Sequence, residues 1–502
     1  MEFTKEQINI INCNDPIIVV NALAGCSKTT TILEWCRKRP HLKILYIVFS
    51  KAMADEAKRS FKDLRNVEVR TTHSLAYKSF GVKYKHKLTT SYRAIDCMRD
   101  LQLNRDYDTA NTILRLFNKF LASNSDNIVE FVENYFENKK FKNIKRIKSY
   151  AKLCEELWNK SLDINSDVQV THDFYLKLYQ MQHIDLGKFY DVMITEEAQD
   201  SSMVVFDMFE CSKSCKHRIA IGDKHQSIFY FRGCVDLMNI ISSKYKDTTT
   251  NLELNGSFRI GQQCADMCNL FLGTFKNENT SMLGYNPSQR VFSGRNLNFD
   301  EVTERFNVIT RTNAVILAHA IEASQRGKWL YFEGGIKSYP FQFYKELYWF
   351  RATGETYNND LKKFESWSDL TQYAEEAEDI ELLSGINFVN IYSKKFDPLP
   401  KAIDKVFEYA VDKRENANFC YCTAHKSKGL TLLEPTLIEN DFPKVNDWLK
   451  IINDVKENDY NINSLIDVYA QIEQEVNLLY VAITRSKGIL YLNDDLSAFF
   501  CI

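Results

Sequence analysis

The residues near the start of the chain that are best suited to chemistry form the stretch NALAGCSKTT, residues 21–30. Four apolar residues, 17–20, precede it and predict a buried strand, while the following TILEWCRKR predicts a helix that ends before Pro40. A loop between a strand and a helix can bind phosphate through converging backbone N–H groups, a lysine and a hydroxyl for Mg²⁺. Gly25, Lys28 and Thr29 can supply the flexible backbone, the cation and the hydroxyl.

The loop departs from the phosphate-binding motif G-x-x-x-x-G-K-[ST], which has glycine where this chain has Ala22 and Ser27. A serine at position 27 costs free energy only if this residue must adopt a positive φ. We expect Ser27 to be entering the helix already, so that serine is tolerated. Taken alone, the stretch fits either a nucleotide site or a strand–turn–helix with an incidental lysine.

Paired carboxylates follow a second apolar run in FYDVMITEEAQD, residues 189–200. A carboxylate at the C-terminal end of a core strand can hold Mg²⁺, and its neighbour can polarise an attacking water. Glu196 and Glu197 are suited to these two tasks. A third apolar run in RIAIGDKHQSIFYFRG, residues 218–233, is followed by Gln226, three aromatic residues and Arg232.

Two arginines, Arg259 and Arg485, lie in separate segments far along the chain, LNGSFRI and NLLYVAITRSKGILYL. Phosphoryl transfer commonly uses such distant arginines to neutralise charge that develops on the γ-phosphate. The segments VITRTNAVIL (308–317) and TAHKSKGL (423–430) lie between them.

In this order, the segments resemble the motif set of superfamily 1 DNA helicases of the UvrD/Rep/PcrA group, and within it the eukaryotic F-box DNA helicases. The resemblance runs from FTKEQINII to LLYVAITRSKGILYL, and is closer in KILYIVFSKAMADEAKRSF, VRTTHSLAY and GGIKSYPF. It implies an ATP hydrolase that moves 3′→5′ on single-stranded DNA and unwinds duplexes in DNA repair, recombination or replication. No F-box segment precedes the first motif, so attachment to a ubiquitin ligase is not expected.

The resemblance assigns nucleotide roles residue by residue. Gln7 is implied to read the adenine edge and Phe258 to stack on adenine. Lys28, Glu197, Gln226, Arg259 and Arg485 are the implied catalytic set, with Glu197 as the catalytic carboxylate. The implied phosphate loop is Ala24, Gly25, Cys26, Ser27, Lys28, Thr29 and Thr30, and Thr29 and Glu196 are the implied ligands of Mg²⁺.

The motifs that line single-stranded DNA in this family contribute Phe49, Thr72, His73, Phe229, Phe231, Arg232, Thr310, Arg311 and His425. Aromatic residues suit this task because every base has a π-face, so stacking binds without sequence preference. The alternative for Phe229 and Phe231 is packing in the protein core.

Two further positions depart from the family pattern. Glu196 stands where the family usually has an aspartate that holds Mg²⁺, and Thr431 stands where a glutamate commonly contacts the nucleotide sugar. Lys28, Glu197 and the two arginines are all present, so we interpret the site as working, with ATP and Mg²⁺ as its ligands. A degenerate ATPase that acts as a scaffold is the less favoured interpretation.

The composition fits a globular protein of several domains. A chain of 502 residues is expected to form about two to four domains. Neither export nor membrane spanning is expected, because no run of basic and then apolar residues opens the sequence and no apolar stretch reaches about 18 residues. The thirteen cysteines are expected to be reduced, and the pairs Cys211/Cys215, Cys264/Cys268 and Cys420/Cys422 lack the spacing and the histidine companions of a zinc site.

The predicted fold class is α/β, with two RecA-like P-loop NTPase domains, each a parallel sheet flanked by helices and each with a mostly helical insertion. The predicted domains are residues 1–85 with 165–260, a DNA-contacting insertion at 86–164, residues 261–320 with 415–502, and a short second insertion at 321–414. The run KKFKNIKRIKSYAK, residues 139–152, carries seven cations and no anion, and is either a solvated helix face or a DNA contact.

Two functions remain open from the sequence. The first is a helicase that binds single-stranded DNA and junctions of single- and double-stranded DNA. The second is a DNA-dependent ATPase subunit of a nuclease or phage-defence complex, or a remodeller of recombinase filaments, and the short second insertion favours it. A nuclease or a recombination protein is the expected protein partner, and binding to a membrane is not expected. The expected location is cytoplasmic and nucleoid-associated for a bacterial or phage protein, and nuclear or cytoplasmic for a eukaryotic or viral one.

Overall fold

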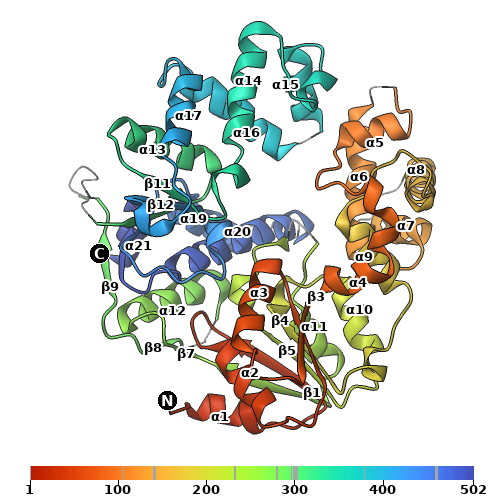
Figure 1. The fold of residues 1–502 in the computed structure, drawn as a ribbon, viewed down its shortest axis with the longest axis vertical. Helices are drawn as coiled ribbons and strands as arrows, with labels where there is room; N and C mark the ends of the chain where they lie inside the picture. The colour runs from red at the N-terminus through yellow and green to blue at the C-terminus, as the bar shows by residue number, and fades with distance from the viewer. Residues whose placement is uncertain are drawn as a thin grey trace. The chain divides into compact units, whose positions relative to one another are not determined.

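The computed structural model describes residues 2–104, 106–138, 143–230, 233–278, 281–295, 297, 304–377, 379–457 and 462–502. Two compact units make up the chain: Met1–Leu23 with Ser27–Leu254, and Ala24–Cys26 with Asn255–Ile502. Figure 1 shows a sheet flanked by helices in each unit. Each unit contains one six-stranded sheet in which every neighbouring pair of strands is parallel. The predicted α/β class with two parallel sheets is confirmed.

The sheet of the first unit has the strand order β3-β2-β4-β5-β1-β6. Its strands are β1 (Ile17–Ala22), β2 (Ile44–Val48), β3 (Val67–Thr71), β4 (Val192–Glu196), β5 (His217–Gly222) and β6 (Thr249–Leu254). The sequences of β2 and β4, ILYIV and VMITE, are buried at every position, as expected for inner strands of a sheet covered on both faces. Since the strands are parallel, the loops that follow β1, β4 and β5 leave the same edge of the sheet.

Helices alternate with these strands and bury their apolar faces on the sheet. They are α1 (Lys5–Asn12), α2 (Lys28–Arg37), α3 (Lys51–Ser60), α4 (Thr72–Ser79), α9 (His172–Gln180), α10 (Met203–Cys211) and α11 (Leu237–Lys244). Helix α11 packs on β1, β5 and β6, while α3 packs on β2 and β3. Apolar side chains from β1, β2, β4, α9, α10 and α11 meet in one core cluster.

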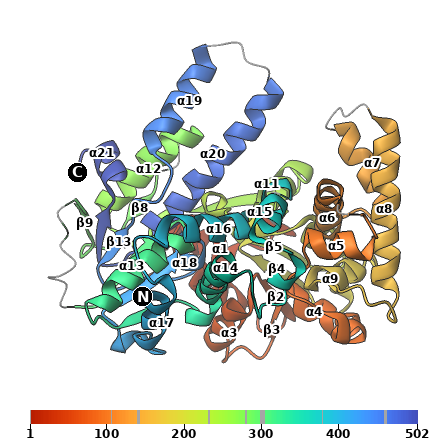
Figure 2. The same ribbon diagram turned by 90° about the horizontal axis from the view of Figure 1, so that it is seen from above.

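A helical block is inserted in the first unit between α4 and α9. It consists of α5 (Ala94–Asp100), α6 (Tyr107–Ala122), α7 (Ile128–Asn138) and α8 (Ile144–Leu162), with α7 and α8 side by side (Figure 2). Its core cluster includes Phe174 of α9, whereas Tyr175 and Tyr179 of the same helix belong to the core of the sheet. Helix α9 therefore joins the helical block to the sheet.

The cationic run lies partly on this block. Residues 139–142, with three of its lysines, lie outside the described residues. Lys145, Arg146 and Lys148 are exposed on the first turns of α8, where Arg146 donates hydrogen bonds to Tyr150 and Asp108.

The sheet of the second unit has the strand order β11-β12-β10-β13-β14-β9. Its strands are β9 (Arg290–Ser293), β10 (Phe306–Thr310), β11 (Leu330–Phe332), β12 (Phe419–Thr423), β13 (Thr436–Ile438) and β14 (Ile489–Leu492). Strand β11 lies within the range 321–414 that the sequence assigned to an insertion. It has only three residues, which pair with Phe419–Tyr421 of β12 at the edge of the sheet. So short a strand forms only through pairing with a neighbouring strand, which the local sequence does not reveal.

The helices of the second unit fall into a set that covers the sheet and a set that follows β11. The first set is α12 (Gln262–Lys276), α13 (Asn313–Gln325), α18 (Ala424–Ser427), α19 (Val445–Glu457), α20 (Ile462–Ile483) and α21 (Asp494–Phe500), and the second is α14 (Phe341–Thr353), α15 (Trp367–Glu376), α16 (Ile380–Tyr392) and α17 (Leu399–Glu408). A separate short pair of strands joins β7 (Gly256–Ser257) to β8 (Leu283–Gly284). In the part of the chain that the structure describes, the helices are too short or too polar to span a bilayer.

Candidate nucleotide-binding site

The loop after β1 contains two residues with positive φ, Gly25 and Ser27. Ser27 is the N-cap of α2 with φ +62° and ψ +43°, and its side chain makes no capping hydrogen bond. The expectation that Ser27 has already entered the helix is therefore wrong: this residue holds the left-handed conformation in which the motif places glycine. A non-glycine residue costs about 1–2 kcal/mol in this region because Cβ crowds the following carbonyl.

Gly25 is required at its position by both conformation and space. Its φ is +75°, and a Cβ at this residue would lie 2.6 Å from the Cβ of Arg259 and from the Oγ of Ser257. The Gly25 carbonyl accepts a hydrogen bond from the backbone N–H of Phe258 at 2.9 Å. Residues 24–26 accordingly group with the second unit. Cys26 is buried, whereas Thr30 is exposed on the first turn of α2.

The predicted phosphate lysine and the predicted catalytic carboxylate are in contact. Lys28 Nζ donates to Glu197 Oε1 at 2.7 Å, and both side chains are largely buried, with 13% and 12% exposed. Glu197 directly follows β4 and has a φ of +52°, an uncommon conformation that functional residues often adopt. The lysine begins α2 and the glutamate follows β4, so the parallel sheet brings them to one edge.

The predicted metal ligands lie beside this pair. Thr29 Oγ1 donates to Glu196 Oε1 at 2.9 Å, and Glu196 is buried at the end of β4. Burial raises the pKa of Glu196, the negative charge of Glu197 raises it further, and Lys28 and Thr29 act in the opposite direction. A hydroxyl and a carboxylate within hydrogen-bonding distance form an all-oxygen donor set, which fits Mg²⁺.

Gln199 is a residue of this site to which the sequence assigned no role. Its amide Nε2 donates to Glu197 Oε2 at 2.5 Å, and its Oε1 accepts the backbone N–H of Asp223 at 3.1 Å. Its backbone carbonyl also accepts a hydrogen bond from Ser227 Oγ. Gln199 is completely buried, and it links the catalytic carboxylate to the segment that follows β5. Gln199 is visible in the sequence segment EEAQD, but its hydrogen bonds to Glu197 and Asp223 form only in the folded chain, so the sequence could not assign it a role.

In the segment that follows β5, the side chain of Gln226 is positioned by a hydrogen bond to Asp223. Gln226 Nε2 donates to Asp223 Oδ2 at 2.8 Å, and the backbone N–H of His225 donates to Asp223 Oδ1. Burial raises the pKa of Asp223, while the charge of Lys28 and the bond from Gln226 lower it. Gln226 is thus fixed three residues before Phe229.

The two residues predicted to recognise adenine differ in exposure. Gln7 is buried: its Oε1 accepts the backbone N–H of Thr4 in a capping box, and its Nε2 donates to Thr31 Oγ1 at 3.2 Å. Thr31 lies on the first turn of α2, so Gln7 contacts the helix that begins at the phosphate loop. Phe258 is 39% exposed and packs on Tyr285 at a centroid distance of 5.3 Å.

The two predicted arginine fingers meet at one residue of the second unit. Arg259 Nη1 donates to the carbonyl of Thr484 at 3.2 Å, and Arg485 Nη2 donates to the Thr484 hydroxyl at 3.0 Å. Arg485 is 1% exposed and also donates to the carbonyl of Val481. Segments that are 226 positions apart in the chain thus place both guanidinium groups around Thr484.

Two of the residues predicted to bind DNA stack on each other. The rings of Phe49 and Phe229 lie 5.2 Å apart with an interplanar angle of 12°. Phe49 follows β2 and Phe229 follows β5, and both are half-buried. Phe231 and Arg232 lie outside the described residues.

The other predicted DNA contacts are distributed over both units. In the first unit, Thr72 begins α4 and is half-buried, and His73 Nε2 lies 3.0 Å from Asp173 Oδ1. In the second unit, His425 is half-buried on α18. Thr310 is completely buried and donates to the carbonyl of Thr312, which argues against a direct contact with DNA.

Arg311 forms hydrogen bonds with two acidic residues, Glu475 and Asp441. It forms a two-point contact with Glu475, in which Nε donates to Oε2 at 2.9 Å and Nη2 donates to Oε1 at 2.8 Å. Its backbone N–H donates to Asp441. The hydrogen bonds to Glu475, together with the charges of both acids, raise the pKa of Arg311.

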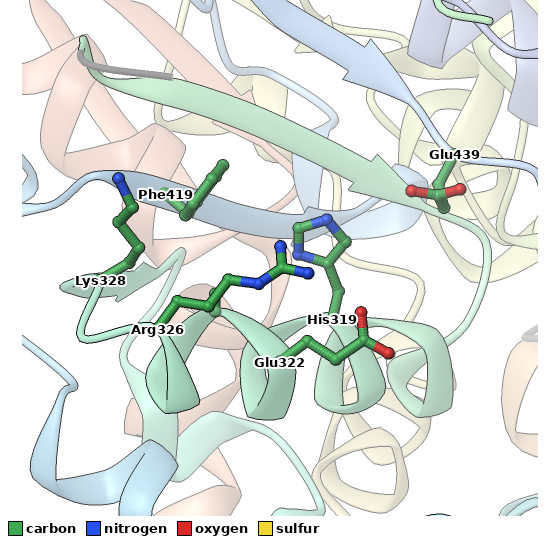
Figure 3. A pocket seen from close by; sticks show the side chains of 7 residues that line it. His319, Glu322, Arg326, Lys328, Phe419 and Glu439 are labelled. Atoms are coloured by element: carbon green, nitrogen blue, oxygen red, sulfur yellow. The ribbon is translucent and has the colours of Figure 1, made fainter. Parts of the chain in front are cut away.

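A cavity of about 280 Å³ in the second unit is separate from these residues (Figure 3). It is lined by His319, Glu322, Ala323, Arg326, Lys328, Phe419 and Glu439. Burial lowers the pKa of His319 to about 4, so its imidazole is neutral near pH 7, and Nδ1 lies 2.8 Å from the hydroxyl oxygen of Tyr421. None of the residues predicted for the nucleotide or DNA sites is among these lining residues.

A loop after β1 that carries Lys28 and Thr29, together with a carboxylate pair at the end of β4 on the same parallel sheet, is the arrangement typical of P-loop nucleoside triphosphatases. Residues 3–248 match the family described as "UvrD/REP helicase N-terminal domain". This part of the chain is similar to that family, and the predicted resemblance to superfamily 1 helicases is confirmed.

Relatives similar to the whole chain support the same conclusion. F-box DNA helicase 1 of Gallus gallus is 26% identical over 99% of this chain and 49% of its own length. F-box DNA helicase protein 1 of Schizosaccharomyces pombe is 27% identical over 99% of this chain and 58% of its own length. The chain therefore spans about half the length of these relatives. An ATP-dependent helicase/nuclease subunit of Clostridioides difficile is 22% identical over 41% of this chain and 16% of its own length.

Proposed function

We propose that this protein is an ATP-dependent DNA helicase that translocates 3′→5′ on single-stranded DNA. The observation that carries the proposal is the buried Gln199, which bonds Glu197 on one side and the backbone of Asp223 on the other. From Asp223 the chain leads through Gln226 to the stacked Phe49–Phe229 pair. A change at the catalytic carboxylate is thereby transmitted to an aromatic platform suited to bases.

Each residue of the nucleotide site has a role in ATP hydrolysis in this proposal. Lys28 binds the terminal phosphates after leaving Glu197, and Glu197 then orients the attacking water and accepts its proton. Thr29 and Glu196 would hold Mg²⁺, which would neutralise phosphate charge. Gln7 and Phe258 keep their adenine roles, and Gln226, Arg259 and Arg485 keep their γ-phosphate roles, as the resemblance implies.

DNA binding in this proposal depends on stacking and on a few polar contacts. Phe49 and Phe229 form the platform, and the resemblance adds Thr72, His73, Phe231, Arg232 and His425. The relatives named as DNA helicases support DNA as the substrate. Lys145, Arg146 and Lys148 form an exposed basic turn on α8 that suits a phosphate backbone.

The second candidate is a DNA-dependent ATPase subunit of a nuclease complex, in which this chain unwinds little DNA by itself. The similarity to a protein named as a helicase/nuclease subunit favours it. The two candidates share ATP hydrolysis and DNA binding, and they differ in strand separation by the isolated chain.

The test combines an ATPase assay with a strand-displacement assay on the full chain. ATP hydrolysis is measured with and without single-stranded DNA, and duplexes with a 3′ tail, a 5′ tail or no tail are then offered. A helicase of the proposed polarity is stimulated by DNA and separates the 3′-tailed duplex alone. Stimulation without separation of any duplex supports the subunit candidate, whereas ATPase activity indifferent to DNA contradicts both.

A further inference from the structure

A mixed cluster of ligand-type side chains lies in the first unit, away from the nucleotide site. His183 Nδ1 is 3.0 Å from Asp207 Oδ2 and 3.8 Å from Cys211 Sγ, and Cys211 Sγ is 3.7 Å from Asp207 Oδ2. Among the described residues, these three form the group of histidine, cysteine and acidic side chains with the spacing of metal ligands. In the sequence, the pair Cys211/Cys215 lacks the histidine companion of a zinc site, whereas the fold brings His183 to Cys211 from 28 positions away.

The three distances match the edges of a coordination tetrahedron. With metal–nitrogen and metal–oxygen bonds of about 2.0–2.2 Å and a metal–sulfur bond of about 2.3 Å, ligand atoms in a tetrahedral zinc site lie about 3.3–3.6 Å apart. The observed separations of 3.0, 3.7 and 3.8 Å deviate from these edges by a few tenths of an ångström. One cation can therefore contact all three atoms after small side-chain rotations.

Local structure directs these side chains to one point. Asp207 and Cys211 are four residues apart on α10, so they lie on the same helix face. His183 is the third residue after α9, where its backbone has a φ of +46° and its N–H donates to the carbonyl of Gln180. The turn after α9 thus presents an imidazole to one face of α10.

The second ring nitrogen of His183 has the partner that metal-bound histidines usually have. Asp126 Oδ2 lies 2.8 Å from His183 Nε2, and a carboxylate in this place fixes the ring orientation and makes the metal-bound nitrogen more basic. Gln180 Nε2 donates to both Asp126 and Asp207, and the buried Lys177 donates to Gln180 Oε1. These hydrogen bonds therefore support His183 and Asp207 from outside the group of ligand atoms.

We propose that His183 Nδ1, an Asp207 carboxylate oxygen and Cys211 Sγ bind one divalent cation of the zinc class, with water as the fourth ligand. A thiolate, an imidazole and a carboxylate together suit zinc or cobalt better than the hard cation Mg²⁺. The side chain of His183 is 42% exposed, which leaves access for water. Binding replaces the thiol proton of Cys211 and any proton on Nδ1, and these protons pass to solvent without a change of oxidation state.

The site would connect two parts of the first unit. Asp207 and Cys211 belong to α10, which packs on α9, and Asp126 belongs to the turn between α6 and α7 of the helical block. A cation bound to His183 would fix its imidazole ring, which contacts both Asp207 of α10 and Asp126 of the helical block. The alternative is a metal-free ion pair in which a protonated His183 bridges Asp126 and Asp207.

The test uses Co²⁺ as a spectroscopic probe on the full chain without nucleotide. We expect one equivalent of Co²⁺ to produce visible bands of a tetrahedral site and a thiolate-to-cobalt charge-transfer band, both displaced by Zn²⁺. Cys211→Ser should remove the charge-transfer band, whereas Cys501→Ser, which changes an exposed thiol elsewhere, should retain it. Asp126→Asn should retain the band and weaken Zn²⁺ binding about 10–100-fold, because it removes only the outer partner of His183.

The charge-transfer band distinguishes Co²⁺ bound at this site from Co²⁺ bound at the predicted Mg²⁺ site, because the latter has no sulfur ligand. A wild-type protein that gives no such band, or a Cys211→Ser variant that retains it, overturns the proposal and leaves His183 as an ion-pair bridge. Thermal unfolding of each variant shows whether it is folded, and a conservative Asp207→Glu variant that still gives the band provides a folded positive control.

Discussion

Lys28 Nζ donates a 2.7 Å hydrogen bond to Glu197 Oε1, so the proposed phosphate lysine and the proposed catalytic carboxylate are directly paired. In the proposed function, ATP binding separates them, because the lysine is needed at the phosphates and the carboxylate at the attacking water. The pair keeps both charges satisfied in a largely buried place until the substrate arrives.

The variant Lys28→Ala should abolish ATP hydrolysis and leave the fold and the binding of single-stranded DNA largely intact. The lysine is the one side-chain cation in the sequence 21–30, so no neighbour can replace it at the phosphates. Steady-state ATPase and DNA-binding assays measure the two effects. Lys62→Ala changes an exposed lysine after α3 and serves as the control. Undiminished turnover in Lys28→Ala would show that this loop is not the active site.

The variant Glu197→Gln should bind ATP normally and hydrolyse it at least about a hundredfold more slowly, because it removes the general base. Gln199 would still hold the side chain through its amide, so the geometry of the site is largely retained. Equilibrium binding of ATP and single-turnover hydrolysis distinguish binding from chemistry. Loss of nucleotide binding would instead assign a metal-holding or structural role to Glu197 and make Glu196 the better candidate for catalysis.

The variant Ser27→Gly should stabilise the protein by about 1 kcal/mol, since glycine adopts the left-handed conformation without the crowding of a Cβ. Ser27→Ala is the matched control. It keeps the Cβ and loses no capping hydrogen bond, so its free energy of unfolding should stay close to that of the wild type. Urea unfolding measures both. A Ser27→Gly protein less stable than Ser27→Ala would show that the left-handed conformation costs less than the extra backbone entropy that glycine loses on folding.

Local patterns were sufficient to predict the pieces of the nucleotide site. Lys28 and Thr29 follow a strand, and Glu196 and Glu197 end another, and parallel strands then place these residues at one sheet edge. The conformation of Ser27 was mispredicted because it depends on the whole loop, in which Gly25 packs against Ser257 and Arg259. The role of Gln199 and the approach of His183 to Cys211 depend on contacts between distant segments, which periodicity and spacing do not encode.

The variant Glu196→Gln should remove a pH-dependent loss of stability from the metal-free protein. Burial raises the pKa of Glu196 above its ordinary value of 4.5, so the folded protein binds more protons here than the unfolded chain. The free energy of unfolding therefore falls as the pH rises from 4.5 through the raised pKa of the folded state. Near pH 7, Glu196→Gln should unfold at a higher temperature than the wild type without Mg²⁺.

The same variant should lose most of the stabilisation that ATP and Mg²⁺ together give the wild type, because the amide is a poor substitute for the anionic ligand. Glu196→Asp keeps the charge and should retain both the pH dependence and the stabilisation by the metal. Thermal melts at several pH values, with and without Mg²⁺ and ATP, measure these differences. An unchanged pH profile in Glu196→Gln would assign the titration to another group, such as Asp223.

The variant Phe229→Ala tests the link between ATP hydrolysis and DNA. Phe229 stacks on Phe49 and lies three residues after Gln226, which is fixed to Asp223 and through it to Gln199 and Glu197. Removal of the ring should weaken binding to single-stranded DNA by about 1–3 kcal/mol, the contribution of one stacked base. Basal ATPase activity should remain, while stimulation by DNA and strand displacement should fall sharply. Phe189→Ala, which removes an exposed phenylalanine that precedes β4, is the control for general loss of aromatic surface.

A double-mutant cycle makes this test specific for the stacked pair. If Phe49 and Phe229 bind the same base, the loss of DNA affinity in the double variant should be smaller than the sum of the two single losses. The remaining affinity should still fall with rising salt, because lysine and arginine contacts to phosphate release counterions. Additive losses from Phe49→Ala and Phe229→Ala would place the rings on separate bases. A Phe229→Ala protein that unwinds DNA at the wild-type rate would exclude this platform from the motor and leave the second candidate, the ATPase component of a nuclease complex, as the better description.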